Sequence, residues 1–206
     1  MNGGVNLAII AMATILSISF VSWLTKDAVT DGRQRWIEQS LNEVVPAALY
    51  DNKMVQQQFT VQNVALGAKK SMPVYPIIKD DVWEGAAITA VAPNGYSGEI
   101  KLLIAIDTTH SLLGVRVLEH RETPGLGDDI ERDKSNWITQ FDNASLAKYT
   151  EPLWRVKKEG GVFDQFTGAT ITPSAVVRSV HRVLTWHQDE GLIELQQRFE
   201  EHQHDQ

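Results

Sequence analysis

The longest apolar run of the chain lies near its N-terminal end. Residues Val5 to Leu24 read VNLAIIAMATILSISFVSWL, twenty positions without a charged side chain. A helix of this length spans about 30 Å, the thickness of the hydrocarbon core of a membrane. Trp23 stands at one end of the run, as tryptophans at the membrane interface often do. The pattern predicts a retained membrane anchor.

A cleaved signal peptide is the alternative interpretation of this run. It would have a positive n-region, a shorter apolar stretch and a small-x-small cleavage site. The four preceding residues contain no Lys or Arg, and Ser17-Ile-Ser19 is a weak cleavage site, so the anchor is preferred. Lys and Arg after the run mildly favour a cytoplasmic C-terminal side. Long domains, however, are translocated largely regardless of such bias, and charge alone leaves the orientation open.

Periodicity after the anchor predicts an α+β domain with a mainly antiparallel sheet flanked by helices. A juxtamembrane helix is expected over Arg33 to Leu49, with a kink or break at Pro46. Asn94-Gly95 is a strong turn signal between two apolar runs and predicts a hairpin. The expected strands are Gln58 to Val64, Trp83 to Val91, Glu99 to Asp107, Leu113 to Glu119, Trp154 to Lys157 and Phe163 to Phe166.

Helical spacing is clearest near the C-terminal end. A helix is expected over Thr172 to Gln188, with Thr172 as its N-cap and Pro173 in the first helical position. Its apolar stripe consists of Val176, Val177, Val180, Val183 and Leu184. Gly191 is expected to interrupt this helix before a second helical stretch, Leu192 to Glu200. A short helix is also expected over Ser135 to Phe141.

Composition narrows the function classes. The chain has 206 residues, a net charge of −7 and no cysteine. The acidic balance argues against nucleic-acid binding, and the absence of cysteine excludes disulfides, thiol catalysis and iron–sulfur ligation by this chain. The six histidines have no spacing typical of a metal site, so no metal is expected.

The stretch Asp164-Gln-Phe-Thr-Gly-Ala-Thr170 stands directly before the expected C-terminal helix. The start of a helix presents unpaired N–H groups and a partial positive charge, which together make an anion site. A phosphate on the Thr170 hydroxyl would lie close to this first turn, and the hydroxyls of Thr167 and Thr172 could bind its oxygens. Gly168 permits close backbone approach, and Ala169 adds no bulk. A simple glycine turn before a capped helix is the alternative.

A second candidate stretch, His120-Arg-Glu-Thr-Pro-Gly-Leu-Gly127, follows the third strand of the predicted middle region. Glu122 and Thr123 supply polar edges, Leu126 supplies an apolar one, and Gly125 and Gly127 keep the loop tight. A planar ring with polar edges needs this mixture. An ordinary loop between a strand and a helix is the alternative.

Together with the anchor and Gly95-Tyr96-Ser97-Gly98, these two stretches resemble the FMN-binding domain family. The similarity is greatest to the G subunits of Rnf ion-translocating electron-transport complexes, which are related to the C subunit of the sodium-pumping NADH:quinone oxidoreductase. The resemblance implies an electron-relay subunit with FMN esterified to Thr170. It also implies contacts with FMN from Asp164, Thr167, Gly168, Ala169, Thr172, Glu122, Thr123, Gly125, Leu126 and Gly127.

The resemblance further implies a single-pass protein of the bacterial inner membrane with its soluble domain in the periplasm. The expected partners are the other membrane and peripheral subunits, the lipid bilayer and a flavin transferase that uses FAD and a divalent metal during maturation. No independent catalytic activity is expected. The alternatives are the equivalent sodium-pump subunit and a cofactor-free scaffold subunit.

The expected organisation follows from these assignments. The anchor covers residues 5–25 after a tip of residues 1–4, and a juxtamembrane helix and linker cover residues 26–55. The FMN-binding domain covers residues 56–190, and a C-terminal helix with a polar tail covers residues 191–206.

Overall fold

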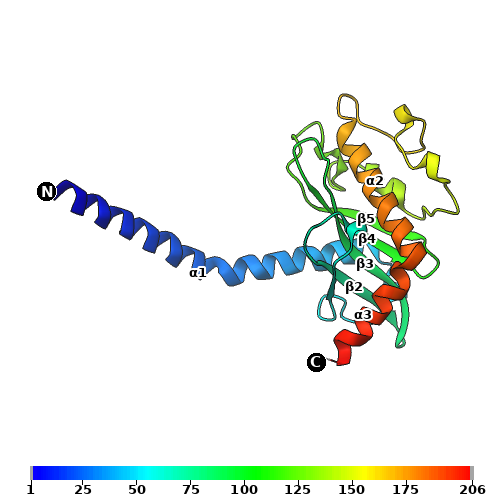
Figure 1. Ribbon diagram of the computed structural model, residues 1–206, viewed down its shortest axis with the longest axis horizontal. Helices are drawn as coiled ribbons and strands as arrows, with labels where there is room; N and C mark the ends of the chain where they lie inside the picture. Colours follow the sequence, from blue (N-terminus) through cyan, green and yellow to red (C-terminus); the bar gives the residue numbers. More distant parts are fainter. Residues whose placement is uncertain (1, 205–206) are drawn as a thin grey trace. The chain divides into compact units, whose positions relative to one another are not determined.

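The computed structural model describes residues 2–204. Contacts divide the chain between Glu38 and Gln39 into two compact units. The first unit contains most of helix α1 (Asn2–Val44). The second contains the last residues of α1 and all the other elements (Figure 1).

Helix α1 is long and apolar enough to cross a membrane. Its large apolar side chains between Val5 and Leu24 are exposed, as a lipid-facing helix requires. The hydroxyls of Thr14 and Ser17 donate hydrogen bonds to carbonyl oxygens one turn earlier, which satisfies these polar groups inside the apolar segment. The structure thus confirms the predicted apolar helix.

The separate helix predicted over Arg33 to Leu49 is wrong in its bounds. Helix α1 continues without interruption from the apolar segment to Val44, and a 3₁₀-helix follows at Ala47–Leu49. Pro46 lies between the two. The α-helix ends before it because proline cannot continue the backbone hydrogen-bond pattern of an α-helix.

Residues 2–204 contain one five-stranded antiparallel sheet in which every strand pairs with its neighbours in sequence. Ile88 of β3 faces Ile104 of β4 at its centre. This meander confirms the α+β class and the hairpin at Asn94-Gly95. The strands are β1 (Phe59–Val61), β2 (Met72–Lys79), β3 (Val82–Ala92), β4 (Ile100–Asp107) and β5 (Leu112–Glu119).

Two C-terminal helices, α2 (Ile171–Trp186) and α3 (Leu192–His204), cover one face of the sheet (Figure 1). Leu102, Ile104 and Ile106 of β4 belong to this core. The predicted apolar stripe of α2 is fully buried in it, which removes these side chains from water and supplies much of the driving force for packing. The stripe comprises Val176, Val177, Val180, Val183 and Leu184.

The last turn of α1 packs on the other face of the sheet. A Cβ added at Gly114 of β5 would lie 3.1 Å from the side chain of Val44, so glycine permits this close approach. Leu41, Val44 and Val45 are buried there. This packing attaches the C-terminal end of α1 to the sheet that carries the site.

Two predicted strands are wrong. Trp154 to Lys157 and Phe163 to Phe166 form 3₁₀-turns and single β-bridges, including Val156 with Phe163. The rings of Trp154 and Phe163 lie 5.2 Å apart in the core, so their apolar pattern reflects the burial of irregular chain.

The predicted interruption at Gly191 is also wrong. A π-helical turn, His187–Gly191, connects α2 to α3 without a break. A Cβ at Gly191 would lie 2.8 Å from the Trp186 ring, so glycine allows the turn to pack against the indole. The predicted helix near Ser135 is a 3₁₀-helix, Trp137–Phe141.

Candidate functional site

Thr170 is the residue that directly precedes helix α2. Its backbone is already helical, with φ −78° and ψ −29°, and its side chain makes no capping hydrogen bond. The predicted N-cap, Thr172, is wrong, because it lies inside the first turn together with Pro173. Gly168 has φ +82°, in the left-handed region that favours glycine, and the Ala169 N–H donates to the Phe166 carbonyl at 3.2 Å. A tight turn therefore leads into the helix.

The loop after β5 is held by its own hydrogen bonds. The Leu126 and Gly127 N–H groups both donate to the Thr123 carbonyl at 3.1 Å. The Gly125 N–H donates to Asp128 Oδ1 at 2.6 Å, and Gly125 has φ +77°. These bonds give the loop a fixed shape.

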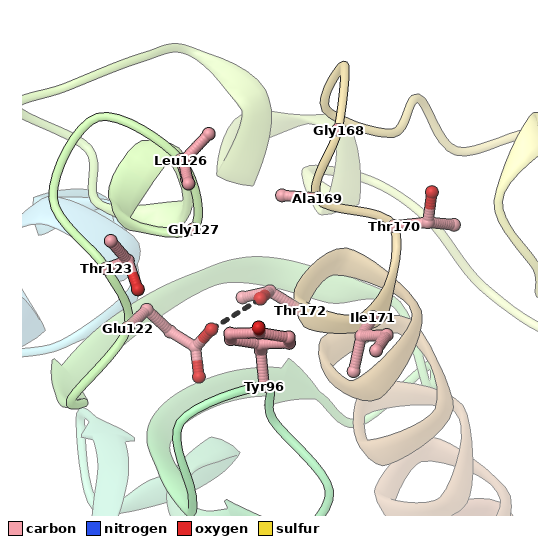
Figure 2. A pocket seen from close by; sticks show the side chains of 10 residues that line it. All are labelled: Tyr96, Glu122, Thr123, Leu126, Gly127, Gly168, Ala169, Thr170, Ile171 and Thr172. Carbon is pink, nitrogen blue, oxygen red and sulfur yellow. Dashed lines mark hydrogen bonds between the residues drawn. The ribbon is translucent and has the colours of Figure 1, made fainter.

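Glu122 joins this loop to the start of α2. The Thr172 hydroxyl donates to Glu122 Oε2 at 2.5 Å, and the Ser97 N–H in the β3–β4 turn donates to Oε1 at 3.0 Å. Glu122 is only 5% exposed. Figure 2 shows its carboxylate beside the Thr172 side chain and the Tyr96 ring. Three segments that are distant in sequence therefore meet at one side chain.

A cavity of about 220 Å³ lies between these segments. Its lining combines two glycines, four polar side chains, three aliphatic side chains and the ring of Tyr96 (Figure 2). The lining residues are Tyr96, Glu122, Thr123, Leu126, Gly127, Gly168, Ala169, Thr170, Ile171 and Thr172.

Comparison with known proteins matches the region around the cavity to a known family. The FMN-binding domain family matches residues 95–185, which contain every residue that lines the cavity. The chain is 44% identical over 181 residues to the G subunit of the ion-translocating oxidoreductase complex of Vibrio vulnificus, covering 88% of this chain and 86% of the relative. It is 45% identical over 179 residues to the G subunit of Photorhabdus laumondii, with 87% and 86% covered.

The chain belongs to the G-subunit family of ion-translocating oxidoreductase complexes. A third relative, the G subunit of Shewanella amazonensis, is 40% identical over 182 residues and covers 88% of this chain and 85% of its own length. The domain that carries the cavity is thus an FMN-binding domain of a G-subunit protein.

Three predicted site residues of this G-subunit protein do not line the cavity. Asp164 forms an ion pair with Lys157 at 2.5 Å, and its carbonyl accepts a hydrogen bond from the Trp137 indole N–H at 2.6 Å. Thr167 is exposed, and Gly125 lies in the loop after β5, where it has φ +77°. Their contacts with FMN stay a prediction.

Sequence reasoning missed Tyr96 and Ile171 as lining residues. Their side chains are 69% and 51% exposed, and Leu126 beside them is 49% exposed. Tyr96 lies in the Gly-Tyr-x-Gly turn, whose sequence indicates the family but not a contact with the cavity. Ile171 directly follows the threonine motif, where its pattern indicates only the approach to the helix.

The cavity fits part of an FMN molecule. Sites that enclose a whole ligand measure about 300–1,000 Å³, so a smaller cavity leaves the rest of the ligand at the surface. Its exposed apolar side chains suit the faces of a planar ring, and its hydroxyl and carboxylate groups suit polar edges. Among the side chains of residues 3–26 and 29–204, which the structure describes, no cluster of three or more potential metal-binding groups is present.

Proposed function

We propose that this G-subunit protein relays electrons within a membrane ion-translocating oxidoreductase complex, with FMN attached covalently to Thr170 through a phosphoester. The observation that carries the proposal is the position of Thr170. It is a partly exposed hydroxyl residue without a capping bond, at the start of α2 and on the edge of the cavity.

The other two threonines of the stretch are poorer candidates for the link. Thr172 is 0% exposed, and its hydroxyl is engaged by Glu122. Thr167 lies outside the cavity lining. Among these three threonines, Thr170 alone combines access from solvent with a place at the cavity.

The start of α2 favours the phosphate electrostatically. Unpaired N–H groups and the helix dipole stabilise an anion at such a position. Figure 2 shows the Thr170 side chain on the side of the helix start that faces away from Glu122. A phosphate there is kept apart from the buried carboxylate, which lowers the repulsion between the two charges.

The ring of FMN would occupy the cavity between the exposed side chains of Tyr96, Leu126 and Ile171. Bound FMN supplies one- and two-electron transfer. The protein's own residues hold it in place, exclude water from one part of it and set its surroundings. Neither Thr170 nor the cavity needs an acid–base role in turnover.

The remaining parts of the proposal come from family membership and α1. We propose that α1 anchors the protein in the bacterial inner membrane, with the domain in the periplasm beside the other subunits of the complex. A separate flavin transferase would attach the FMN. The strong similarity to the G subunits favours this complex over the sodium-pumping NADH:quinone oxidoreductase.

Gel fluorescence tests the covalent link. The full chain is coexpressed with the flavin transferase, denatured in SDS and separated by electrophoresis. Flavin fluorescence is expected on the wild type and on Thr167→Val, and it is expected to be absent from Thr170→Val. Retained fluorescence on Thr170→Val would show that the link is at another residue. A wild type without fluorescence would contradict the proposal and favour a cofactor-free scaffold subunit.

A further inference from the structure

Glu122 stands out because it is a buried carboxylate. Among the side chains that the structure describes, those of residues 3–26 and 29–204, the salt bridges involve other carboxylates, and none pairs a cation with Glu122. Burying such a charge is costly unless hydrogen bonds replace its hydration. The Thr172 hydroxyl and the Ser97 N–H provide this replacement, one at each oxygen. The position of the carboxylate is therefore fixed by donors from two other segments.

Two glycines make room for the same carboxylate. A Cβ at Gly95 would lie 2.7 Å from Glu122 Oε1, and a Cβ at Gly127 would lie 2.8 Å from Oε2. Side-chain contacts this short do not occur without a shift. The glycines thus let the hairpin and the loop close around Glu122, and the carboxylate is the common contact of the hairpin, the loop and α2.

We infer that Glu122 is a positioning residue for flavin attachment, acting through Thr172 on Thr170. By accepting the Thr172 hydrogen bond, it fixes the first turn of α2, and this orientation presents the Thr170 hydroxyl to the flavin donor. The inference rests on the proposed function of Thr170.

Attachment itself is a phosphoryl transfer. The Thr170 oxygen forms a bond to the FMN-side phosphorus of FAD, the pyrophosphate P–O bond breaks, AMP leaves, and the hydroxyl proton is released. Glu122 does not touch these atoms in the structure, since its oxygens face Thr172 and Ser97. Its contribution is to hold the acceptor hydroxyl in place, and such alignment affects the rate of transfer.

The test measures the rate of flavin attachment with purified full-length apo-protein in detergent, the transferase, FAD and Mg²⁺. Fluorescence on denaturing gels gives kcat and KM for the protein acceptor. Thr172→Val and Glu122→Ala are expected to lower kcat about tenfold or more, the effect of losing a hydrogen bond to a charged group, with KM little changed. Thr172→Ser keeps the hydroxyl and is expected to attach flavin at nearly the wild-type rate.

A conservative change and a double variant separate positioning from general loss of structure. Glu122→Gln keeps one oxygen that can accept a hydrogen bond, but its NH₂ group then faces either the Thr172 hydroxyl or the Ser97 N–H, each of which donates in the wild type. This variant is therefore expected to lower kcat without unfolding the domain. Gly127→Ala should be harmful alone and less harmful when Glu122 is already alanine, because the 2.8 Å contact with Glu122 Oε2 is then absent while the 2.9 Å contact with its Cβ remains. Circular dichroism checks that each variant is folded.

The outcomes distinguish this inference from the proposed function. Flavin on Thr170→Val would overturn the attachment site itself. An unlabelled Thr170→Val, together with wild-type kcat in folded Thr172→Val and Glu122→Gln, would leave the site intact and refute the positioning role. A Thr172→Ser variant as slow as Thr172→Val would also refute it, because the hydroxyl would then not matter.

Discussion

Arg116 of β5 donates a hydrogen bond from Nε to Glu43 Oε2 at 2.8 Å, and its Nη2 donates to the Glu43 carbonyl at 3.3 Å. Glu43 is the residue before the end of α1, so this pair attaches the helix end to the sheet. Burial raises the pKa of Asp142, while Arg116 and Arg132 lower it. Arg116 therefore forms an ion pair with Glu43, and its charge also lowers the pKa of Asp142.

Arg116→Met should destabilise the domain by about 1–2 kcal/mol, since it removes hydrogen bonds to a charged group that is partly exposed. Chemical denaturation of the full chain in detergent measures the loss. Glu43→Gln is the matched control, because it retains an acceptor for Arg116 and should lose less. Equal stability of Arg116→Met and the wild type would show that this pair contributes nothing.

His187 is expected to make the folded domain sensitive to acid. Its side chain is fully buried, and Nδ1 lies 3.0 Å from Nδ1 of His110. Burial first, and then His110, lower the pKa of His187 to about 4, against an opposing effect of Asp107. The unfolded chain, with the ordinary pKa of about 6.5, binds more protons in this window, so stability is complete above pH 6.5 and falls as the pH drops toward 4.

The expected loss from this histidine is about 2 kcal/mol between pH 7 and pH 5. Denaturation at a series of pH values measures it. His187→Leu removes the titrating group and should flatten this part of the profile, even if packing changes its overall stability. A variant with the same slope as the wild type would assign the acid sensitivity to other groups.

Gly168 is expected to be needed for its backbone conformation. No atom lies within 4 Å of a Cβ built at this position, so a side chain would meet no neighbour. The strain comes from φ +82°, which costs a residue with a Cβ about 1 kcal/mol. Gly168→Val should therefore slow flavin attachment. Gly168→Asn should slow it less, because asparagine adopts positive φ more readily than valine does. Equal rates for valine and glycine would contradict this role.

The exposed apolar side chains at the cavity should bind the flavin ring. Tyr96→Ser and Leu126→Ser are expected to leave FMN attached but its ring more mobile, because apolar contact is lost. Fluorescence anisotropy of the attached flavin measures this mobility. Ile193→Ser is the control, since Ile193 is 62% exposed but does not line the cavity. Unchanged anisotropy in all three variants would place the ring elsewhere.

Regular periodicity made much of the fold predictable. The apolar run of α1, the Asn94-Gly95 turn and the stripe of α2 each follow one local rule. Strand β2 was not predicted, and it contains Pro73 and Pro76, which lack the N–H that a strand normally uses. Near Trp154 the error was the opposite one, because strands were predicted where there are only single bridges. The buried aromatic side chains there give the same apolar pattern as a strand.

The site was predictable from motifs but its connections were not. The two stretches were found as separate patterns, and in the structure residues of both line one cavity. Thr172 was expected to cap the helix, but its hydroxyl donates to a carboxylate fifty positions earlier. No local rule reveals such a partner. Tyr96 and Ile171 were missed because their role depends on which exposed side chains converge.

The order of pairing in the sheet has a consequence for maturation. Each strand finds its partner in the neighbouring strand, so β2 to β5 can assemble from local contacts. The cavity differs, since it needs residues on both sides of a 50-residue interval. It is complete only when α2 has returned to the sheet. If flavin attachment requires the complete cavity, only molecules whose α2 has packed on the sheet would carry a covalent flavin. The attached flavin would therefore identify fully folded molecules.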